Sequence, residues 1–200
     1  MDRARNLALT LAVMVLVTTP AFAHPGHSDG SGFAAGFLHP LSGLDHLLAM
    51  IAIGILAGSY GGWALVSIPA AFLALMAAGG AIGMSGIAIP GVDWAIALSV
   101  LVFGGLITSW TKFSSSVVAA LAGTFAIFHG AAHGTELPAT MDPLAFGTGF
   151  MVATTFLIAV GVSLCHMSVR LAAHDNKLRK LGGGATALSG ALLLANVAFA

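Results

Sequence analysis

Long apolar stretches alternate with short polar connections along almost the whole chain. After Ser31, six stretches approach the roughly 20 residues that a helix needs to cross a bilayer. They cover residues 33–58, 63–83, 92–110, 115–133, 143–166 and 182–200. No connection between them has the length or polarity of a soluble domain. The pattern therefore predicts an all-α integral membrane protein, with about six transmembrane helices in one membrane domain that covers residues 24–200.

The first 23 residues have the form of a secretory signal peptide. Arg3 and Arg5 precede an apolar run over residues 7–17, and residues 21–23 provide a small-x-small cleavage site. An uncleaved first transmembrane helix is the alternative, but the run is short and a hydrophilic stretch follows it. Cleavage would leave His24 at the mature N-terminus, and with His27 it could form a weak metal-collecting tip or a mobile tail without a role.

Composition supports the membrane assignment and excludes several functions. Hydrophobic residues make up 58% of the chain and charged residues 7%, whereas soluble domains carry about 25% charged residues. Seven basic residues balance seven acidic ones, so no basic surface for nucleic acid is expected. Cys165 is the single cysteine, which excludes an intramolecular disulfide and cysteine-based metal clusters. The eight histidines are therefore the unusual feature of this sequence.

The basic residues predict the orientation of the spans. With the mature N-terminus outside, the cytoplasmic connections are residues 59–62, 111–114 and 167–181. They contain every basic residue of the mature chain: Lys112, Arg170, Lys177, Arg179 and Lys180. The outer connections, residues 84–91 and 134–142, contain Glu136 and Asp142 but no Lys or Arg. Because Lys and Arg are enriched in cytoplasmic loops, both mature termini are expected to face outward.

Pairs of glycines predict close helix packing within the bilayer. Gly54 and Gly58 lie four residues apart, as do Gly79 and Gly83. This small-xxx-small spacing places both members on one helix face and lets two helices approach closely. We interpret these glycines as packing residues.

The first polar motif interrupts the first span. His39 and Pro40 are followed by Asp45, His46 and Met50. Proline disfavours helix in the residue before it, so we expect the first span to be broken at His39-Pro40. In a helix continuing from Pro40, His46 and Met50 share a face, and Asp45 lies about 100° away from His46. Asp45 could then be a direct metal ligand or an acceptor for an imidazole of another helix.

The second polar motif closes the fourth span. His129, His133 and Glu136 have the spacing i, i+4 and i+7, which places them on one face if the helix persists through Gly134. Imidazole and carboxylate together suit borderline divalent cations such as nickel, cobalt and zinc. Ionisable groups within a membrane are costly and usually functional. The alternative is that these histidines only cap the span at the lipid interface.

At these two motifs the sequence resembles the HupE/UreJ family of bacterial nickel and cobalt permeases. The family carries an HPxxGxDH motif in its first span, and the residues that match it are His39, Pro40, Gly43, Asp45 and His46. Residues 128–136 look like the family's second motif. The resemblance covers nearly the whole chain and implies uptake of Ni²⁺ or Co²⁺ across the inner membrane, for hydrogenase, urease or cobalamin enzymes.

We therefore expect a secondary permease that works without an attached ATPase. The membrane potential would favour inward movement of a cation. The expected metal ligands are His39, Asp45, His46, His129, His133 and Glu136. No cofactor is expected to stay bound, because a transported ion must leave its site. Metal identity, proton coupling and oligomeric state are left open by the sequence.

Two other functions compete with transport. An intramembrane zinc hydrolase would use three histidines to hold zinc and a carboxylate to activate water, and the same residues could supply both. The expected six spans and the metal-collecting tip favour the permease over this enzyme. A purely structural membrane subunit is the third possibility, and two polar motifs inside the bilayer argue against it.

Overall fold

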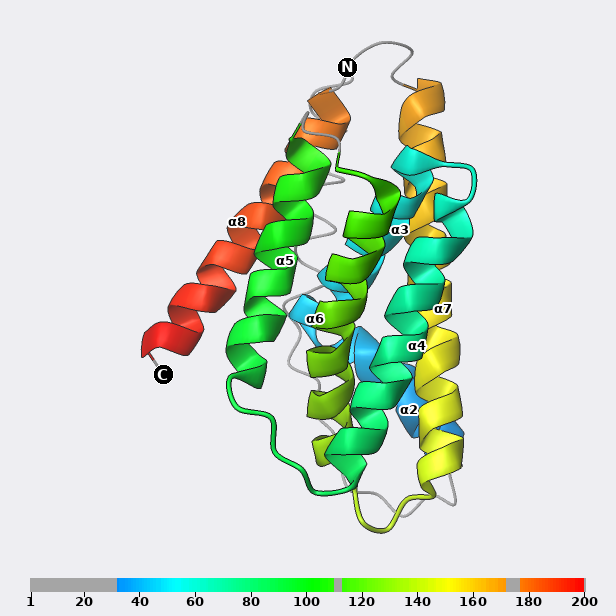
Figure 1. Cartoon of the computed structure of the whole chain (residues 1–200), viewed down its shortest axis with the longest axis vertical. Coiled ribbons are helices and arrows are strands. Elements are labelled where there is room, and N and C mark those ends of the chain that lie inside the picture. The colour runs from blue at the N-terminus through cyan, green and yellow to red at the C-terminus, as the bar shows by residue number, and fades with distance from the viewer. Residues whose placement is uncertain (1–31, 110–112, 172–176, 200) are drawn as a thin grey trace, which may run out of the picture.

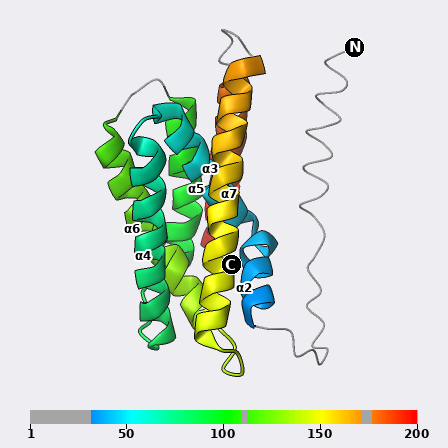
Figure 2. The ribbon, with the colours of Figure 1, turned by 90° about the vertical axis from the view of Figure 1, so that its right-hand side faces the viewer.

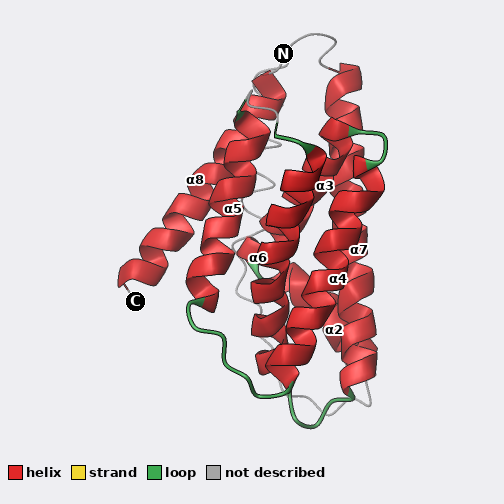
Figure 3. Ribbon diagram, in the orientation of Figure 1, coloured by secondary structure: helices red, strands yellow, loops and turns green. Residues whose placement is uncertain are grey.

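Every regular element that the structure describes is a helix. The computed structural model describes residues 32–109, 113–171 and 177–199. The helices are α2 (Gly32–Ser42), α3 (Leu44–Tyr60), α4 (Ala64–Met84), α5 (Val92–Thr108), α6 (Ser115–Glu136), α7 (Pro143–Leu171) and α8 (Lys177–Phe199) (Figure 3). The all-α prediction is therefore confirmed. The expected signal peptide, with His24 and His27, lies outside the described residues.

Within the described residues, up to five spans are long and apolar enough to cross a bilayer. Four are the single helices α4, α6, α7 and α8, and the bent pair α2–α3 is the fifth. The remaining predicted span, residues 92–110, corresponds to α5, which is apolar but only 17 residues long. At 1.5 Å per residue it measures about 26 Å, slightly less than the roughly 30 Å hydrocarbon core. The chain is thus a multi-pass membrane protein.

The first span is broken, but at Gly43 and not at His39-Pro40 as expected. Pro40 lies inside α2, and the 85° bend comes after Ser42. The Ser42 hydroxyl donates to the His39 carbonyl at 2.6 Å, which satisfies an acceptor at the helix end. Because Pro40 has no backbone N–H, it cannot donate to the carbonyl of Gly36 in the preceding turn, which weakens the last turn of α2. Gly43 adopts an extended conformation (φ −100°, ψ 122°), and the chain changes direction there before α3 begins.

The connections lie at two opposite ends of the bundle. In Figure 1, the α3–α4 connection, the end of α7 and the start of α8 lie at the upper end, while the α4–α5 and α6–α7 connections lie at the lower end. Arg170 and Lys177 therefore lie at the upper end, and Glu136 and Asp142 lie at the lower end. This separation matches the charge pattern expected of a cytoplasmic and an outer end.

Glycines bring α4 and α6 into backbone contact. These two helices run side by side in both views (Figures 1 and 2). A Cβ atom at Gly79 would overlap the Ile127 carbonyl oxygen, and one at Gly130 would overlap the Met76 carbonyl oxygen. The predicted packing role of Gly79 is confirmed, since any side chain there would push the two helices apart.

The same device joins α3 to α7. A Cβ atom at Gly54 would overlap the Ile158 carbonyl oxygen, and one at Gly58 would lie 2.9 Å from the Cβ atom of Cys165. The helix contacts enclose an apolar core between α3, α4, α5 and α6. Its largest fully buried side chains include Met50, Ile53, Phe72, Met76, Phe103 and Val118. The polar motifs lie where this core meets α2 and the lower half of α7.

Candidate metal site

Four histidines from three helices form a continuous column of rings, here called the imidazole column. The ring centroids of His39 (α2) and His133 (α6) are 4.7 Å apart. His133 is 4.0 Å from His46 (α3), and His46 is 4.6 Å from His129 (α6). The bend at Gly43 makes this possible, because it lets α2 and α3 approach α6 from different directions.

Burial increases from the outer end of the column to its inner end. The carboxylate of Glu136, beside its outer end, is 58% exposed, and the His39 side chain is 29% exposed. His133 and His46 are each 7% exposed, and His129 is fully buried. The column therefore leads from an accessible rim into the protein core.

The outer end of the column is a cluster of two imidazoles and a carboxylate, here called the rim triad. His39 Nε2 lies 3.1 Å from Glu136 Oε2. His133 Nδ1 lies 3.5 Å from the same oxygen. One ligand atom from each of the three residues falls within 4.8 Å of the others. This donor set suits a borderline divalent cation.

At the inner end, each imidazole has a polar neighbour on one side only. His46 Nδ1 lies 2.9 Å from Asp45 Oδ1, which also accepts the backbone N–H of His46 at 2.9 Å. His129 Nε2 lies 2.9 Å from Ser99 Oγ of α5. The other nitrogens, His46 Nε2 and His129 Nδ1, are buried without a hydrogen-bond partner. Buried polar atoms are usually paired, so these two require an explanation.

The glycines of the second motif help to place its imidazoles beside α2 and α3. Helix α6 continues through Gly134 to Glu136, as the i, i+4, i+7 interpretation required. Gly130 and Gly134 face the backbone of α4, where Cβ atoms would overlap the carbonyl oxygens of Met76 and Gly80. The adjacent positions, His129 and His133, lie about 100° around the helix from these glycines, and their rings meet those of His39 in α2 and His46 in α3.

In the first motif, Gly43 leaves room for the Asp45–His46 pair. A Cβ atom at Gly43 would lie 2.8 Å from Asp45 Oδ1 and 3.1 Å from His46 Nδ1. Asp45 is therefore an acceptor, as one of the two expectations held, but for the neighbouring His46 and not for an imidazole of another helix. The structure thus brings the six sequence-predicted residues together around one column.

Sequence reasoning missed three neighbours of the column. Ser99 is fully buried beside His129. Phe150 lies 4.3 Å from the His133 ring and Phe146 lies 5.5 Å from the His39 ring, measured between centroids. A polar residue in the middle of an apolar span could have drawn attention to Ser99. The two phenylalanines carry no comparable signal, because apolar residues are common throughout α7.

His166 is the remaining histidine in the described part of the chain, and it lies outside the column. His166 is exposed near the upper end of α7, where its Nδ1 donates to the Val162 carbonyl at 3.0 Å. His24, His27 and His174 lie outside the described residues.

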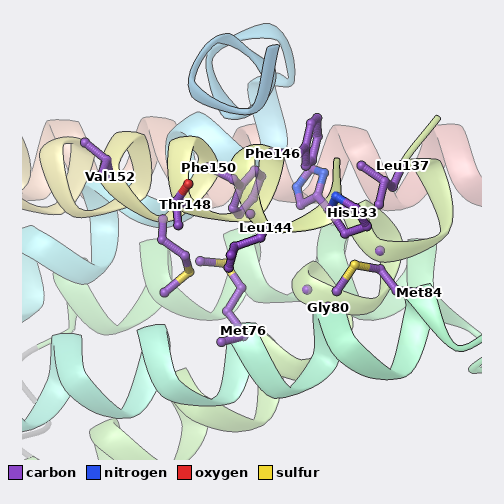
Figure 4. Close-up of a pocket in the computed structure, with 16 residues that line it drawn as sticks. Met76, Gly80, Met84, His133, Leu137, Leu144, Phe146, Thr148, Phe150 and Val152 are labelled. Atoms are coloured by element: carbon purple, nitrogen blue, oxygen red, sulfur yellow. The ribbon is translucent and has the colours of Figure 1, made fainter. Parts of the chain in front are cut away.

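An apolar pocket of about 640 Å³ opens between α4, α6 and α7 beside the rim triad. Its lining includes the thioethers of Met76, Met84 and Met151. His133 lies at one end of it, near Leu137 (Figure 4). His133 is thus shared by the pocket and the column.

The chain shows its family in a comparison with known proteins. Residues 11–193 match the family described as HupE / UreJ protein. The chain belongs to the HupE/UreJ family. It is 42% identical over 190 residues to Protein HupE of Rhizobium leguminosarum bv. viciae, a match that covers 94% of this chain and 97% of that protein. No solved structure matches the chain. The family resemblance predicted from the two motifs is therefore confirmed.

Proposed function

We propose that this protein is a secondary permease that takes Ni²⁺ or Co²⁺ across the bacterial inner membrane to supply metalloenzymes such as hydrogenase or urease. The observation that carries the proposal is the imidazole column, which begins at the accessible rim triad and ends at the fully buried His129. A chain of donors that leads into a membrane bundle suits an ion that moves, because a transported ion needs several sites that release it.

The proposed direction of transport is inward from the periplasmic side. The rim triad lies at the end of the bundle that carries Glu136 and Asp142, opposite to Arg170 and Lys177. The position of the basic residues at the opposite end supports a periplasmic location for the rim end. A divalent cation captured there is drawn inward by the membrane potential, and no bound nucleotide or permanent cofactor is required.

Zinc-dependent hydrolysis is the second candidate, and one observation favours it. Two histidines and a carboxylate form a ligand set used by catalytic zinc, and the apolar pocket next to His133 could hold an acyl chain. However, a hydrolase requires only the rim triad. It leaves the buried His46 and His129, with their unpaired nitrogens, without a purpose.

Purified protein separates the two functions. We expect weak, exchangeable metal in the isolated protein, and proteoliposomes with an inside-negative potential should accumulate nickel or cobalt faster than protein-free vesicles. Excess of either metal should compete with uptake of the other. A stoichiometric, tightly held zinc ion together with hydrolysis of a lipid or amide, and no metal accumulation, would establish the enzyme instead.

A further inference from the structure

The inner end of the imidazole column contains two nitrogens whose protonation can be derived from their neighbours. The Ser99 hydroxyl has one hydrogen, and it is donated to the Ile96 carbonyl at 2.6 Å. Towards His129 Nε2, 2.9 Å away, Ser99 Oγ can therefore only accept. His129 must carry its hydrogen on Nε2, which leaves the lone pair on Nδ1.

The same reasoning gives the opposite tautomer for His46. Asp45 Oδ1 already accepts the His46 backbone N–H, and a carboxylate offers no hydrogen to donate. His46 Nδ1, 2.9 Å from this oxygen, must therefore be the N–H nitrogen. The lone pair lies on Nε2.

Both of these lone-pair nitrogens, His129 Nδ1 and His46 Nε2, are buried without a hydrogen-bond partner, as are the two ring nitrogens of His133 between the sites. The rings of His46 and His129 are perpendicular, with centroids 4.6 Å apart. Two buried lone pairs without a donor are an unfavourable arrangement unless something electron-poor lies between them. A carboxylate or hydroxyl that holds the far nitrogen of a ligating histidine is also the usual support of a metal site.

His46 and His129, here called the inner pair, lie apart from Glu136, because the ligand atoms that fall within 4.8 Å of one another belong to His39, His133 and Glu136. Positions 129 and 136 are seven residues apart on the continuous helix α6, which corresponds to about 10.5 Å along its axis. Metal–nitrogen and metal–oxygen bonds are only about 2.0–2.2 Å long. An ion held by the rim triad and an ion held by His129 therefore occupy two different positions.

We infer that His46 and His129 form an inner cation site, distinct from the rim triad, in which Ser99 fixes the hydrogen of His129 so that Nδ1 faces the ion. The site takes a borderline divalent transition-metal cation, because its donors are imidazole nitrogens. His133 lies between the two positions, 4.7 Å from His39 and 4.0 Å from His46 between ring centroids, so it can pass the ion inward. This inference rests on the proposed transport function and adds a second binding site to the proposed pathway of the ion.

Titration of the metal-free, full-length protein with Co²⁺ tests the site, since the visible spectrum of Co²⁺ reports nitrogen ligation. We expect two bound equivalents in the wild type. His129→Ala should remove the Co²⁺ equivalent of the inner site, and Glu136→Gln should weaken binding of the equivalent at the rim triad. Ser99→Ala should weaken the inner equivalent about 10- to 100-fold, as loss of a supporting hydrogen bond to a ligand does. Ser168→Ala is the matched control, because Ser168 also donates to a carbonyl three residues earlier, that of Cys165, but near the opposite end of the bundle.

Nitrogen NMR of the metal-free protein labelled in its histidines gives a readout that a purely structural serine would not move. His129 should show the Nε2–H tautomer and His46 the Nδ1–H tautomer. Ser99→Ala should change only the signal of His129, while melting in detergent remains near that of Ser168→Ala.

Three results would overturn the inner site. The first is that the protein binds a single equivalent of Co²⁺ and still binds it after His129→Ala. The second is that it binds two equivalents whose affinities do not change in Ser99→Ala. The third is that nitrogen NMR finds the hydrogen of His129 on Nδ1. Each leaves the proposed transport function standing if vesicles still accumulate nickel or cobalt. Absence of both cobalt binding and metal accumulation would reject the inner site and the transport function together.

Discussion

One short segment of helix α6 has two faces with different roles. Gly130 and Gly134 lie against the backbone of α4, where no side chain fits. His129, His133 and Glu136 lie on the face that meets α2 and α3, where each contacts a polar or aromatic group. The comparison teaches that packing and chemistry are separable within this motif. Substitutions on the glycine face should affect folding, and those on the histidine face should affect function.

The largest effect is expected on the glycine face. Gly130→Ala places a Cβ atom against backbone atoms of Met76 and Gly80, which cannot move without separating the helices. Overpacking typically costs about 1–3 kcal/mol, and contact with backbone should give the upper end of that range or more. We expect a large loss of membrane protein and a lowered melting temperature in detergent.

Gly105→Ala is the matched control for this variant. Gly105 lies within α5, and a Cβ atom there would meet nothing within 4 Å. Its substitution should be neutral or stabilising by about 0.5–1 kcal/mol, because alanine loses less entropy in a helix. Similar losses of protein for both variants would contradict the packing role of the glycine face.

Acidification should reduce metal uptake, which depends on the histidine face, while the packing of the glycine face keeps the protein folded. An imidazole must be neutral to bind a metal, and its ordinary pKa is about 6.5, so protons compete increasingly as the pH falls below that value. Because several imidazoles take part, uptake into proteoliposomes should fall about tenfold or more between about pH 7 and about pH 5. The membrane potential is clamped and protein-free vesicles correct for leakage. Uptake that stays constant or rises on acidification would contradict imidazole ligation.

A smaller effect is expected at Gly43, which packs against the functional groups themselves. Gly43→Ala adds a Cβ atom beside Asp45 Oδ1 and His46 Nδ1, while the backbone conformation there is available to alanine. We expect metal uptake to fall several-fold with protein abundance near normal. A loss of abundance equal to that of Gly130→Ala would assign Gly43 to packing alone.

Local patterns allowed much of the fold and of the site to be predicted. The i, i+4, i+7 spacing of His129, His133 and Glu136 depends only on helical geometry, and α6 provides it. The predicted position of the break in the first span is wrong, because the effect of proline on its neighbours concerns only the local backbone. The actual break at Gly43 also depends on how closely Asp45 and His46 approach that residue.

A serine within an apolar span is a sequence signal at Ser99, but its role could not be predicted, since that role comes from a residue 30 positions away. A serine in an apolar helix ordinarily donates to the preceding turn, and Ser99 does this as well. Its second contact, with His129, exists only after α5 and α6 have packed. Contacts between distant segments of this kind, like those of Phe146 and Phe150 with the column, require the tertiary structure.

The most direct test of the account is nickel and cobalt uptake in cells that produce Glu136→Gln or its neighbour Thr135→Ala. Thr135 is exposed and donates only to the carbonyl of Ala132 in its own helix. We expect saturable uptake in the wild type, a loss of about tenfold or more for Glu136→Gln, and a change within about twofold for Thr135→Ala. Protein abundance should be equal in all three. The account is contradicted if wild-type cells accumulate no more metal than cells without the protein, or if Glu136→Gln transports as well as the wild type.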